Sequence, residues 1–319
     1  MKLIIQIPCL NEANTLSSVV GDLPKKIKGI TTIEYLVIDD GSNDKTVDVA
    51  KSLKVNHILS LGTNRGLAQA FEKGVEFSLK KGADIIVNTD GDNQYNGKDI
   101  EKLVEPIINN YGDMVIGCRP IINHPEFSKT KKLLQLVGSF ILRRLSQTTV
   151  KDATSGFRAI SRETALKLII HSKFSYTLET LIQAGNIGLR VVSIDININL
   201  KTRDSRLFSS IPIYLKNSFK TIISITFYYR PSLIFNIMAS FLFTGSLFLG
   251  GRFIYLTYLT PSPDIERTYI PSLILLSILG TLSVIVFLVG FVAELLAKHR
   301  RITEQVMKEV RYLRFREKN

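Results

Sequence analysis

In the first two hundred residues, short runs of apolar and often β-branched residues alternate with longer stretches in which apolar residues recur at helical spacing. The apolar runs, which are typical of strands covered on both faces, are Leu3–Ile7, Tyr35–Ile38, His57–Leu61, Ile85–Val87 and Met114–Ile116. The stretches with helical spacing are Thr15–Val20, Lys45–Leu53, Leu67–Lys80 and Asp99–Ile108. This order of elements predicts an α/β domain with a mainly parallel sheet and helices on both faces.

The last third of the chain has a different pattern, with two stretches that contain no charged residue, Pro231–Gly251 and Pro271–Ala293. As helices they would be roughly 31 and 35 Å long at ~1.5 Å per residue, and the hydrocarbon core of a bilayer is ~30 Å thick. The alternative is a pair of buried core helices, but such helices rarely run so far without a charge. The proline-containing segment Leu259–Ile270 is typical of a turn. We therefore expect a membrane hairpin, with transmembrane helices over residues 231–258 and 271–296.

Positive charge is concentrated in the same third of the chain. The sequence has 41 Lys and Arg against 28 Asp and Glu, a net charge of +13, of which +9 falls in residues 201–319. The cations that flank the hairpin on its chain-end side are Lys216, Lys220, Arg230, Lys298, Arg300 and Arg301. The turn has Arg267. By the positive-inside rule we expect a multi-pass protein of the cell (inner) membrane, with both termini and the N-terminal domain cytoplasmic. A nucleic-acid partner is not expected.

The segments that border the hairpin fit this orientation. Residues 207–230 alternate apolar and polar positions at helical spacing and are predicted to lie in the membrane interface. Residues 297–319 are predicted to form a basic cytoplasmic tail on the leaflet. The first ten residues are too short an apolar run for a signal peptide. Two cysteines, Cys9 and Cys118, give no reason to expect a disulfide in a cytoplasmic domain.

Polar residues follow each of the five predicted strands, at the carboxyl edge where ligands of parallel sheets bind. These residues are Pro8-Cys9-Leu10-Asn11-Glu12, Asp39-Asp40-Gly41-Ser42, Thr63-Asn64-Arg65-Gly66, Asp90-Gly91-Asp92-Asn93-Gln94 and Cys118-Arg119. Asp90 and Asp92 offer oxygens to a hard cation such as Mg²⁺ or Mn²⁺. A cation held there would stabilise a diphosphate as a leaving group.

Each of these motifs alone also has a structural explanation. An Asp-x-Asp pair arises by chance roughly 0.6 times in a chain of this composition. The segment Asp39-Asp40-Gly41-Ser42 fits a turn with a helix N-cap equally well, and Asn64 with Gly66 fits a loop. The placement of all of them at successive strand ends is therefore the stronger evidence for a site.

Together the motifs resemble a known family. The residues that carry the resemblance are Pro8-x-x-Asn11-Glu12, Ile38-Asp39-Asp40-Gly41-Ser42, Asn64-x-Gly66, Asp90-x-Asp92-x-Gln94 and Asp152-x-x-Ser155-Gly156-Phe157-Arg158. They are similar to those of family-2 glycosyltransferases with the GT-A fold, a Rossmann-like α/β fold, and in particular to the dolichol-phosphate mannosyltransferase-like branch. The resemblance implies a catalytic domain over residues 1–206, followed by the membrane anchors that bacterial polyprenyl-phosphate glycosyltransferases carry.

The resemblance also implies roles for individual residues. The donor, a nucleotide-diphosphate sugar such as GDP-mannose or a UDP-sugar, would contact Pro8, Leu10, Glu12, Ile38, Asp40, Asp90, Gly91, Asp92, Arg119, Arg203 and Arg206. The metal, Mg²⁺ or Mn²⁺, would bind Asp90, Asp92 and Gln94. The acceptor phosphate would contact Ser155, Arg158 and Arg206, and the catalytic residues would be Asp92, Arg158 and Arg203. Leu10 stands where this branch often has an aromatic residue, and Gly91 where it usually has alanine.

The acceptor side favours a phosphate over a hydroxyl. The chain has no Trp, so it lacks the Gln-x-x-Arg-Trp motif of polysaccharide synthases, and no clear catalytic carboxylate follows Asp92. A phosphate monoester with a second pKa of ~6 is already anionic at neutral pH and needs no general base. Arg203 and Arg206 are suited to clamp phosphates, although a basic stripe against anionic lipid would explain them as well. Asp152 is expected to orient Arg158 or to lie in a loop.

These observations predict an inverting, metal-dependent transfer of a single sugar from a nucleotide-diphosphate sugar to a polyprenyl (dolichyl or undecaprenyl) phosphate. Two alternatives stay open: transfer to a sugar or protein hydroxyl, and a non-catalytic membrane protein that binds nucleotide-sugars. A third, in which the hairpin itself translocates the lipid, is not favoured for a monomer, because two spans offer no buried polar path. A homo-oligomer is compatible with the sequence.

Overall fold

The computed structural model describes residues 1–120, 138–140, 143–144, 146–170, 176–199, 220, 223–224, 226–227, 230–259 and 270–316. The chain forms two compact units. The first comprises Met1–Lys216 together with Met307–Asn319, and the second comprises Asn217–Val306.

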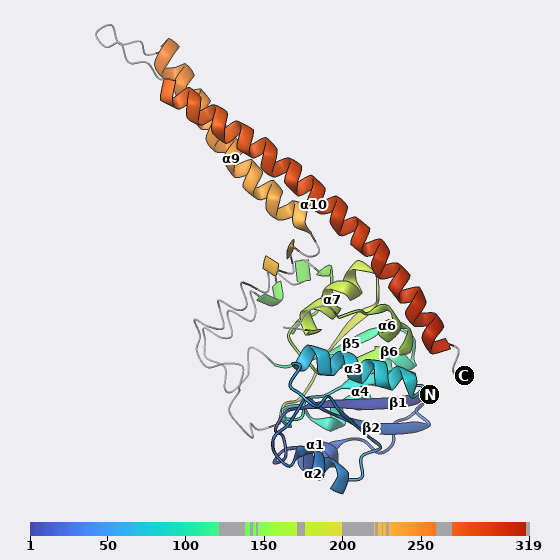
Figure 1. The fold of residues 1–319 in the computed structure, drawn as a ribbon. Helices are drawn as coiled ribbons and strands as arrows, with labels where there is room; N and C mark the ends of the chain where they lie inside the picture. Colours follow the sequence, from blue (N-terminus) through green and yellow to red (C-terminus); the bar gives the residue numbers. More distant parts are fainter. Residues whose placement is uncertain are drawn as a thin grey trace. The chain divides into compact units, whose positions relative to one another are not determined.

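The first unit is built on one sheet with the strand order β3-β2-β1-β4-β6-β5-β7 (Figure 1). Its strands are β1 (Lys2–Cys9), β2 (Thr32–Asp39), β3 (His57–Ser60), β4 (Ile85–Asn88), β5 (Met114–Cys118), β6 (Arg158–Ser161) and β7 (Val191–Asp195). Strand β6 runs antiparallel to both of its neighbours, and the other neighbouring strands are parallel. The predicted mainly parallel sheet is confirmed.

All five predicted strands are present, and the sequence pattern missed two. Strand β6 has only four residues and begins with an arginine, and β7 is an edge strand of half-buried residues, so neither presents a continuous apolar run. Strand β3 was expected to be covered on both faces, but it lies at the other edge and is only half-buried. Without a continuous apolar run, a short strand cannot be separated from a loop by its sequence pattern.

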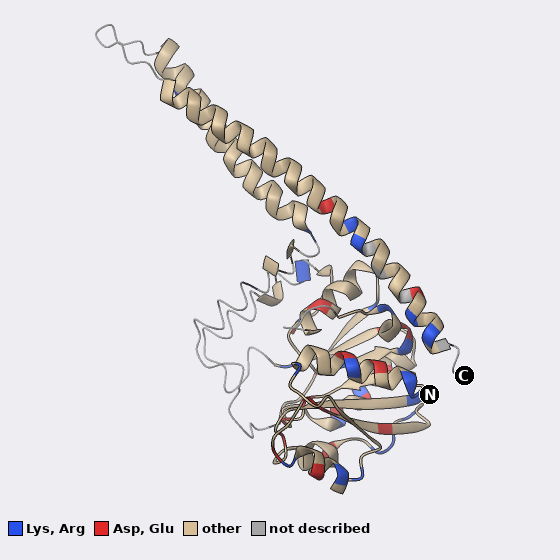
Figure 2. Ribbon diagram, viewed as in Figure 1, with Lys and Arg blue, Asp and Glu red and all other residues tan. Residues whose placement is uncertain are grey.

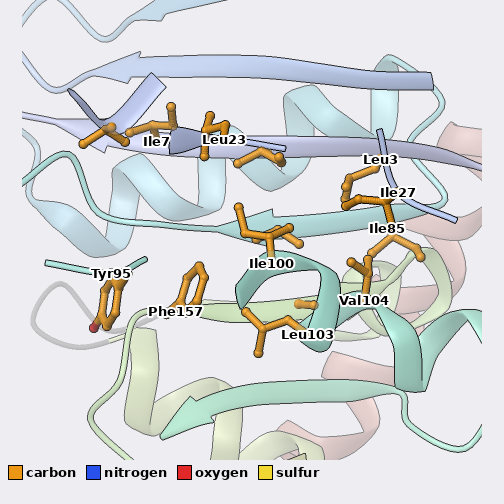
Figure 3. Packing of buried hydrophobic residues seen from close by; sticks show 14 of the residues in the cluster. Leu3, Ile7, Leu23, Ile27, Ile85, Tyr95, Ile100, Leu103, Val104 and Phe157 are labelled. Carbon is orange, nitrogen blue, oxygen red and sulfur yellow. The ribbon is translucent and has the colours of Figure 1, made fainter. Parts of the chain in front are cut away.

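Helices cover both faces of this sheet, and their bounds are α1 (Leu16–Asp22), α2 (Thr46–Ser52), α3 (Leu67–Lys80), η1 (Gly97–Asp99), α4 (Ile100–Ile108), α6 (Arg162–Lys167) and α7 (Tyr176–Asn186). One face packs against α1, α2 and α4, where Leu3, Ile85, Ile100 and Val104 share a buried cluster (Figure 3). The other face packs against α3. Strand-end loops are thereby fixed on a rigid base.

The second unit holds a helical hairpin made of α9 (Pro231–Ile254), a π-helical turn η2 (Tyr255–Leu259) and the first part of α10 (Ile270–Arg316). Both helices are long and apolar enough to cross a membrane, and only 11% of the most apolar stretch of each is buried. Figure 2 shows almost no charge along these stretches. Helices of a soluble core would be mostly buried, so this pattern favours contact with lipid. Most of the predicted turn lies outside the described residues.

Small and polar residues hold the two hairpin helices together. Ser246 Oγ donates to the Leu276 carbonyl at 3.0 Å, and Ser283 Oγ donates to the Ala239 carbonyl at 2.9 Å. Near the other end, Ser232 Oγ donates to Glu294 Oε2 at 2.8 Å. Hydrogen bonds from serine hydroxyls across a helix pair are typical of helices in membranes.

Helix α10 continues past the hairpin, and its last turns, Met307–Arg316, belong to the first unit. We call this segment the docked helix end. Phe315 is 6% exposed there, and its carbonyl accepts a hydrogen bond from Arg162 Nη2 at 3.2 Å. Arg311 Nη2 lies 3.6 Å from Glu76 Oε1 of α3, and Arg311 Nη1 donates to the Leu168 carbonyl. Residues 297–319 were expected to form a basic tail on the lipid surface. In the described part of this tail, a buried aromatic ring and two arginine contacts attach Met307–Arg316 to the first unit.

Candidate active site

Polar residues gather at the carboxyl edge of the parallel strands β1, β2 and β4 and of β5. The antiparallel strand β6 adds to this edge, because Arg158 at its start pairs with Asn88 at the end of β4. The Phe157 carbonyl accepts a hydrogen bond from the Gly117 N–H of β5 at 2.8 Å. The segment from Ser155 to Phe157 therefore reaches the same edge as Asp90. The pattern of apolar runs alone did not predict this position for the segment.

The loop after β1 is joined to the loop after β4 through Thr15. Thr15 Oγ1 lies 2.9 Å from Glu12 Oε2 and donates to the Gly91 carbonyl at 2.6 Å. Gly91 is packed so closely here that a Cβ atom at this position would lie 2.9 Å from Cys9 Sγ and 3.3 Å from the Pro8 carbonyl oxygen. In this chain Cys9 thus explains the glycine, where the resembling branch usually has alanine. Predicted donor residues of both loops lie together.

Asp39, the last residue of β2, and Asp40, which follows it, organise turns. Asp40, 4% exposed, accepts hydrogen bonds from the backbone N–H groups of Arg65 and Gly66 at 2.8 and 2.9 Å. Asp39 accepts from the Ser42 N–H at 3.0 Å. Asp40 therefore fixes the loop after β3 at the site, as well as standing at the predicted donor edge.

Ile38 and Leu10, two of the apolar residues predicted to contact the donor, differ in their surroundings. Ile38 is fully buried in β2, and a Cβ atom on Gly74 of α3 would lie 2.4 Å from Ile38 Cδ1, so this side chain packs in the core. Leu10 is half-buried directly after β1. The Leu10 side chain can therefore reach a bound donor. The Ile38 side chain is part of the core beneath the carboxyl edge.

Asp90 has a buried carboxylate oxygen, Oδ1, without a hydrogen-bond partner among the described residues. A Cβ atom on Gly156 would lie 3.1 Å from this oxygen and 2.8 Å from the Tyr176 hydroxyl. Burial, and then repulsion by Asp92, raise the pKa of Asp90 to about 7, against the attraction of Arg119 and Arg158. A cation bound beside these two carboxylates would relieve their repulsion and give the buried Asp90 Oδ1 a partner. The donor set therefore fits a divalent cation.

Asp92 and Gln94 lie on one tight turn. Asp92 Oδ1 accepts a hydrogen bond from the Gln94 N–H at 3.1 Å, and Asn93 between them has a left-handed backbone with φ of 59°. Both residues are only partly buried. No group of three or more His, Cys, Asp or Glu side chains able to hold a metal occurs in the part of the chain that the structure describes. A cation here would be bound by Asp90, Asp92 and the Gln94 amide, with its remaining ligands coming from a bound diphosphate.

Arg119, directly after β5, forms a buried ion pair with Asp152. Arg119 Nε donates to Asp152 Oδ2 at 2.7 Å, and Arg119 Nη2 donates to Thr154 Oγ1 at 3.0 Å. Burial acts to raise the pKa of Asp152, but the Arg119 guanidinium outweighs it and holds that pKa below its usual range. Asp152 was expected to orient Arg158 or to lie in a loop. It lies in a loop, and the partner of its carboxylate is Arg119, which follows β5 at the same carboxyl edge.

Arg158 is 1% exposed, and its guanidinium donates to protein acceptors behind the edge. Arg158 Nη1 donates to Thr180 Oγ1 at 2.7 Å, and Nη2 donates to the carbonyl of Ser155, which is itself fully buried. The guanidinium carbon lies 5.4 Å from the Tyr176 ring centroid. Contact with an acceptor phosphate was expected for Arg158 and Ser155. Their burial favours a different role, in which they hold the segment beside Asp90.

The remaining predicted phosphate clamps, Arg203 and Arg206, and most of the interfacial segment 207–230 lie outside the described residues. Within the described ranges, sequence reasoning missed residues that shape the edge without belonging to a motif. Asn88 Nδ2 donates to the Gly156 carbonyl at 2.9 Å, and the Tyr95 hydroxyl accepts from the Gly156 N–H at 3.2 Å. No sequence signal marks these residues, since their partners are 61 to 68 positions away.

The fold and its acidic edge have the architecture of a GT-A glycosyltransferase. The crystal structure of glucosyl-3-phosphoglycerate synthase from Mycobacterium tuberculosis with Mn²⁺, UDP and phosphoglyceric acid matches with a TM-score of 0.54 at 18% identity, covering 70% of this chain and 76% of that one. At this identity the likeness concerns the fold, and the predicted GT-A fold is confirmed.

The model of glycosyl transferase family 2 matches residues 4–168, so the chain belongs to this family and is a glycosyltransferase. Undecaprenyl-phosphate mannosyltransferase of Micrococcus luteus is 28% identical over 209 residues, which cover 61% of this chain and 83% of that protein. UDP-N-acetylglucosamine--dolichyl-phosphate N-acetylglucosaminyltransferase of Methanococcus voltae is 32% identical over 197 residues, covering 56% and 76%. The predicted resemblance to the polyprenyl-phosphate branch is confirmed.

Proposed function

We propose that this glycosyltransferase transfers one sugar from a nucleotide-diphosphate sugar to a polyprenyl phosphate, with inversion at the anomeric carbon. The observation that carries the proposal is the presence, in one chain, of a family 2 acidic edge and two helices long enough to cross a membrane. Two relatives that match the catalytic region are named for lipid-phosphate acceptors. A soluble acceptor would give no reason for such helices.

The second part of the proposal is dependence on Mg²⁺ or Mn²⁺. Asp90, Asp92 and Gln94 would hold the cation, supported by the unpartnered Asp90 Oδ1 and the turn that joins Asp92 to Gln94. When bound, it would neutralise the donor diphosphate and so stabilise the leaving group. Pro8, Leu10, Glu12, Asp40 and Gly91 would line the donor.

The acceptor phosphate needs no general base. One of its oxygens attacks the anomeric carbon in line, a C–O bond to that phosphate forms, and the bond to the nucleoside diphosphate breaks. Among the described carboxylates, Asp152 is paired with Arg119 and Asp40 is held by two backbone N–H groups, so neither is placed to remove a proton from a hydroxyl. Arg203 and Arg206 would clamp the phosphates, and Arg158 with Ser155 would keep the edge in shape.

The proposed location is the cytoplasmic face of the cell membrane, with both chain ends cytoplasmic. This orientation is supported by the cations at the chain-end side of the hairpin, of which Arg230, Lys298 and Arg300 lie in the described part of the chain. Polyprenyl phosphate exposes its charged group at that surface. The donor and the acceptor would then meet at one membrane face.

The function is tested with purified full-length protein in detergent, Mn²⁺ or Mg²⁺, and undecaprenyl or dolichyl phosphate. GDP-mannose and UDP-sugars carrying a radiolabel are supplied one at a time, and label in the lipid extract is counted. We expect label in the lipid with one donor and its release by mild acid, because a glycosyl phosphate hydrolyses readily. Absence of lipid product with every donor, or an acid-stable product, would contradict the proposal.

A specific prediction concerns donor binding at Gly91. The Gly91→Ala variant should raise the KM for the donor about tenfold, because the added methyl group displaces Cys9 and Pro8, an overpacking cost of about 1–3 kcal/mol. The control is the Cys9→Ala, Gly91→Ala double variant, in which the sulfur atom is removed and KM should return toward the wild-type value. Steady-state kinetics with varied donor decide this, and a Gly91→Ala enzyme with unchanged KM would refute it.

A further inference from the structure

Asn199 holds the backbone of the loop that carries two of the proposed metal ligands. It lies four residues beyond β7, and its neighbour Ile198 forms an isolated antiparallel bridge with Tyr95. The Asn199 N–H donates to the Gln94 carbonyl at 3.0 Å. Its side-chain amide nitrogen lies 3.2 Å from the Asn93 carbonyl oxygen and 3.2 Å from the Tyr95 carbonyl oxygen. One residue thus satisfies three consecutive carbonyl groups of the loop.

These contacts act on a loop with an uncommon backbone conformation. Asn93 has φ of 59°, a left-handed conformation that residues other than glycine adopt rarely, asparagine more often than most. The Asn199 amide also lies 3.3 Å from Asn93 Oδ1, so it bonds both to the backbone and to the side chain of this left-handed residue. Because Asp92 Oδ1 accepts from the Gln94 N–H, the conformation at Asn93 sets how the Asp92 and Gln94 side chains are directed.

The loop is anchored on its other side by the Tyr95 side chain. Tyr95 is 5% exposed and stacks on Phe157 with ring centroids 4.9 Å apart. This anchor fixes the end of the loop in the core, and the partners of the Tyr95 side chain include Phe157 and the Gly156 N–H. Among the described residues, hydrogen bonds to the Asn93 and Gln94 carbonyls from outside the loop come from Asn199. The conformation at Asn93 therefore depends on Asn199.

We propose that Asn199 is a positioning residue for metal binding: its backbone and side-chain N–H groups hold Asp92 and Gln94 in the arrangement that takes up the divalent cation of a nucleotide diphosphate. This inference rests on the proposed metal site at Asp90, Asp92 and Gln94. Partners in the outer shell of a metal site change its affinity by about 10- to 100-fold when they are removed. Asn199 is such a partner, and it acts by hydrogen bonds to the backbone of the loop that carries Asp92 and Gln94.

Asn197 offers a matched control two positions away. Its backbone N–H donates to Asp99 Oδ2 at 2.7 Å, and its side chain is exposed and makes no hydrogen bond to the described residues. Substitution of Asn197 therefore keeps the backbone contact and changes no contact to the loop. The pair of positions separates loss of the amide from any general effect on this segment.

The experiment measures Mn²⁺ binding to the full-length protein without turnover, from the loss of the free Mn²⁺ electron paramagnetic resonance signal. Mn²⁺ alone, Mn²⁺ with UDP and Mn²⁺ with GDP are titrated into wild type, Asn199→Ala, Asn199→Asp, Asn197→Ala and Asn197→Asp. We expect both Asn199 variants to weaken Mn²⁺ binding about tenfold or more, and both Asn197 variants to stay within twofold of wild type. Transfer assays should show a raised KM for Mn²⁺ and a nearly unchanged kcat at saturating Mn²⁺.

Asn199→Asp is the stricter variant because it keeps the shape of asparagine. It replaces the amide N–H donor by a carboxylate, which would face the Asn93 and Tyr95 carbonyl oxygens and Asn93 Oδ1. It also adds negative charge, which by simple attraction would tighten cation binding. Weaker binding by Asn199→Asp therefore supports the inference. Wild-type affinity in both Asn199 variants would overturn it and leave the proposed function intact. Wild-type protein that takes up no Mn²⁺ even with UDP or GDP would overturn the proposed metal site itself.

Discussion

Replacement of Asp92 by alanine is expected to lower the rate of sugar transfer by about a thousandfold, equivalent to about 4 kcal/mol of transition-state stabilisation. Asp92 stands at the acidic edge beside Asp90, and its carboxylate is joined to Gln94 by a hydrogen bond of 3.1 Å. Loss of a metal that neutralises a leaving group removes several kcal/mol. Because Asp92 is only partly buried, the fold should tolerate the change.

The Asp92→Ala result is read from initial rates with saturating donor, and from the melting temperature of the same preparation. Asp195→Ala is the matched control, since Asp195 is an aspartate at the end of β7 whose side chain is 77% exposed and paired with Lys151. This control should keep its activity within twofold. An Asp92→Ala enzyme with more than a tenth of the wild-type rate would remove Asp92 from the proposed metal site.

The second large effect is expected for Asp152→Asn, which should lower the free energy of unfolding by about 3–5 kcal/mol. Asp152 is fully buried, and the Arg119 side chain beside it is 11% exposed, so the substitution leaves a buried guanidinium without its counter-charge. The effect is measured as a lowered melting temperature of the protein in detergent. Lys151→Ala, which removes an exposed ion pair next along the chain, should change the free energy of unfolding by less than about 1 kcal/mol.

The pH dependence of this difference follows from the lowered pKa of Asp152. A carboxyl whose folded-state pKa lies below its unfolded value of about 3.9 stabilises the fold fully above that value, and loses this contribution as the pH falls through the folded-state pKa. The gap in melting temperature between wild type and Asp152→Asn should therefore be constant from about pH 7 to 5 and narrow below about pH 4. A gap that widens in acid would show that another interaction carries the stability.

The sequence predicted those helices and strands of the first unit whose apolar residues follow a clear local pattern. The bounds of α3, Leu67–Lys80, agree with the spacing of its apolar residues, and β1 and β4 are buried as their continuous apolar runs require. The gathering of Glu12, Asp90 and Asp92 at one edge follows from parallel topology, because each of them comes after a strand that ends there.

What could not be predicted depends on contacts between distant residues. Asp152 is 33 positions from Arg119, and no spacing rule connects them. Asn199 is more than a hundred positions from Asn93, and it belongs to no motif. The antiparallel β6 reverses the direction of a sheet that alternating elements predict to be parallel, and it is this reversal that brings Ser155 and Gly156 to the edge.

The docked helix end makes the first unit, which contains the candidate active site, discontinuous in sequence. Its two parts, Met1–Lys216 and Met307–Asn319, are separated in sequence by the hairpin that follows the GT-A domain, so the chain returns to the first unit after the hairpin. A soluble fragment that stops before α9 would lack the buried ring of Phe315, and it would deprive Arg162 and Glu76 of contacts they make in the full chain. A water-soluble version of the enzyme therefore calls for excision of the hairpin, with Met307–Arg316 rejoined by a linker.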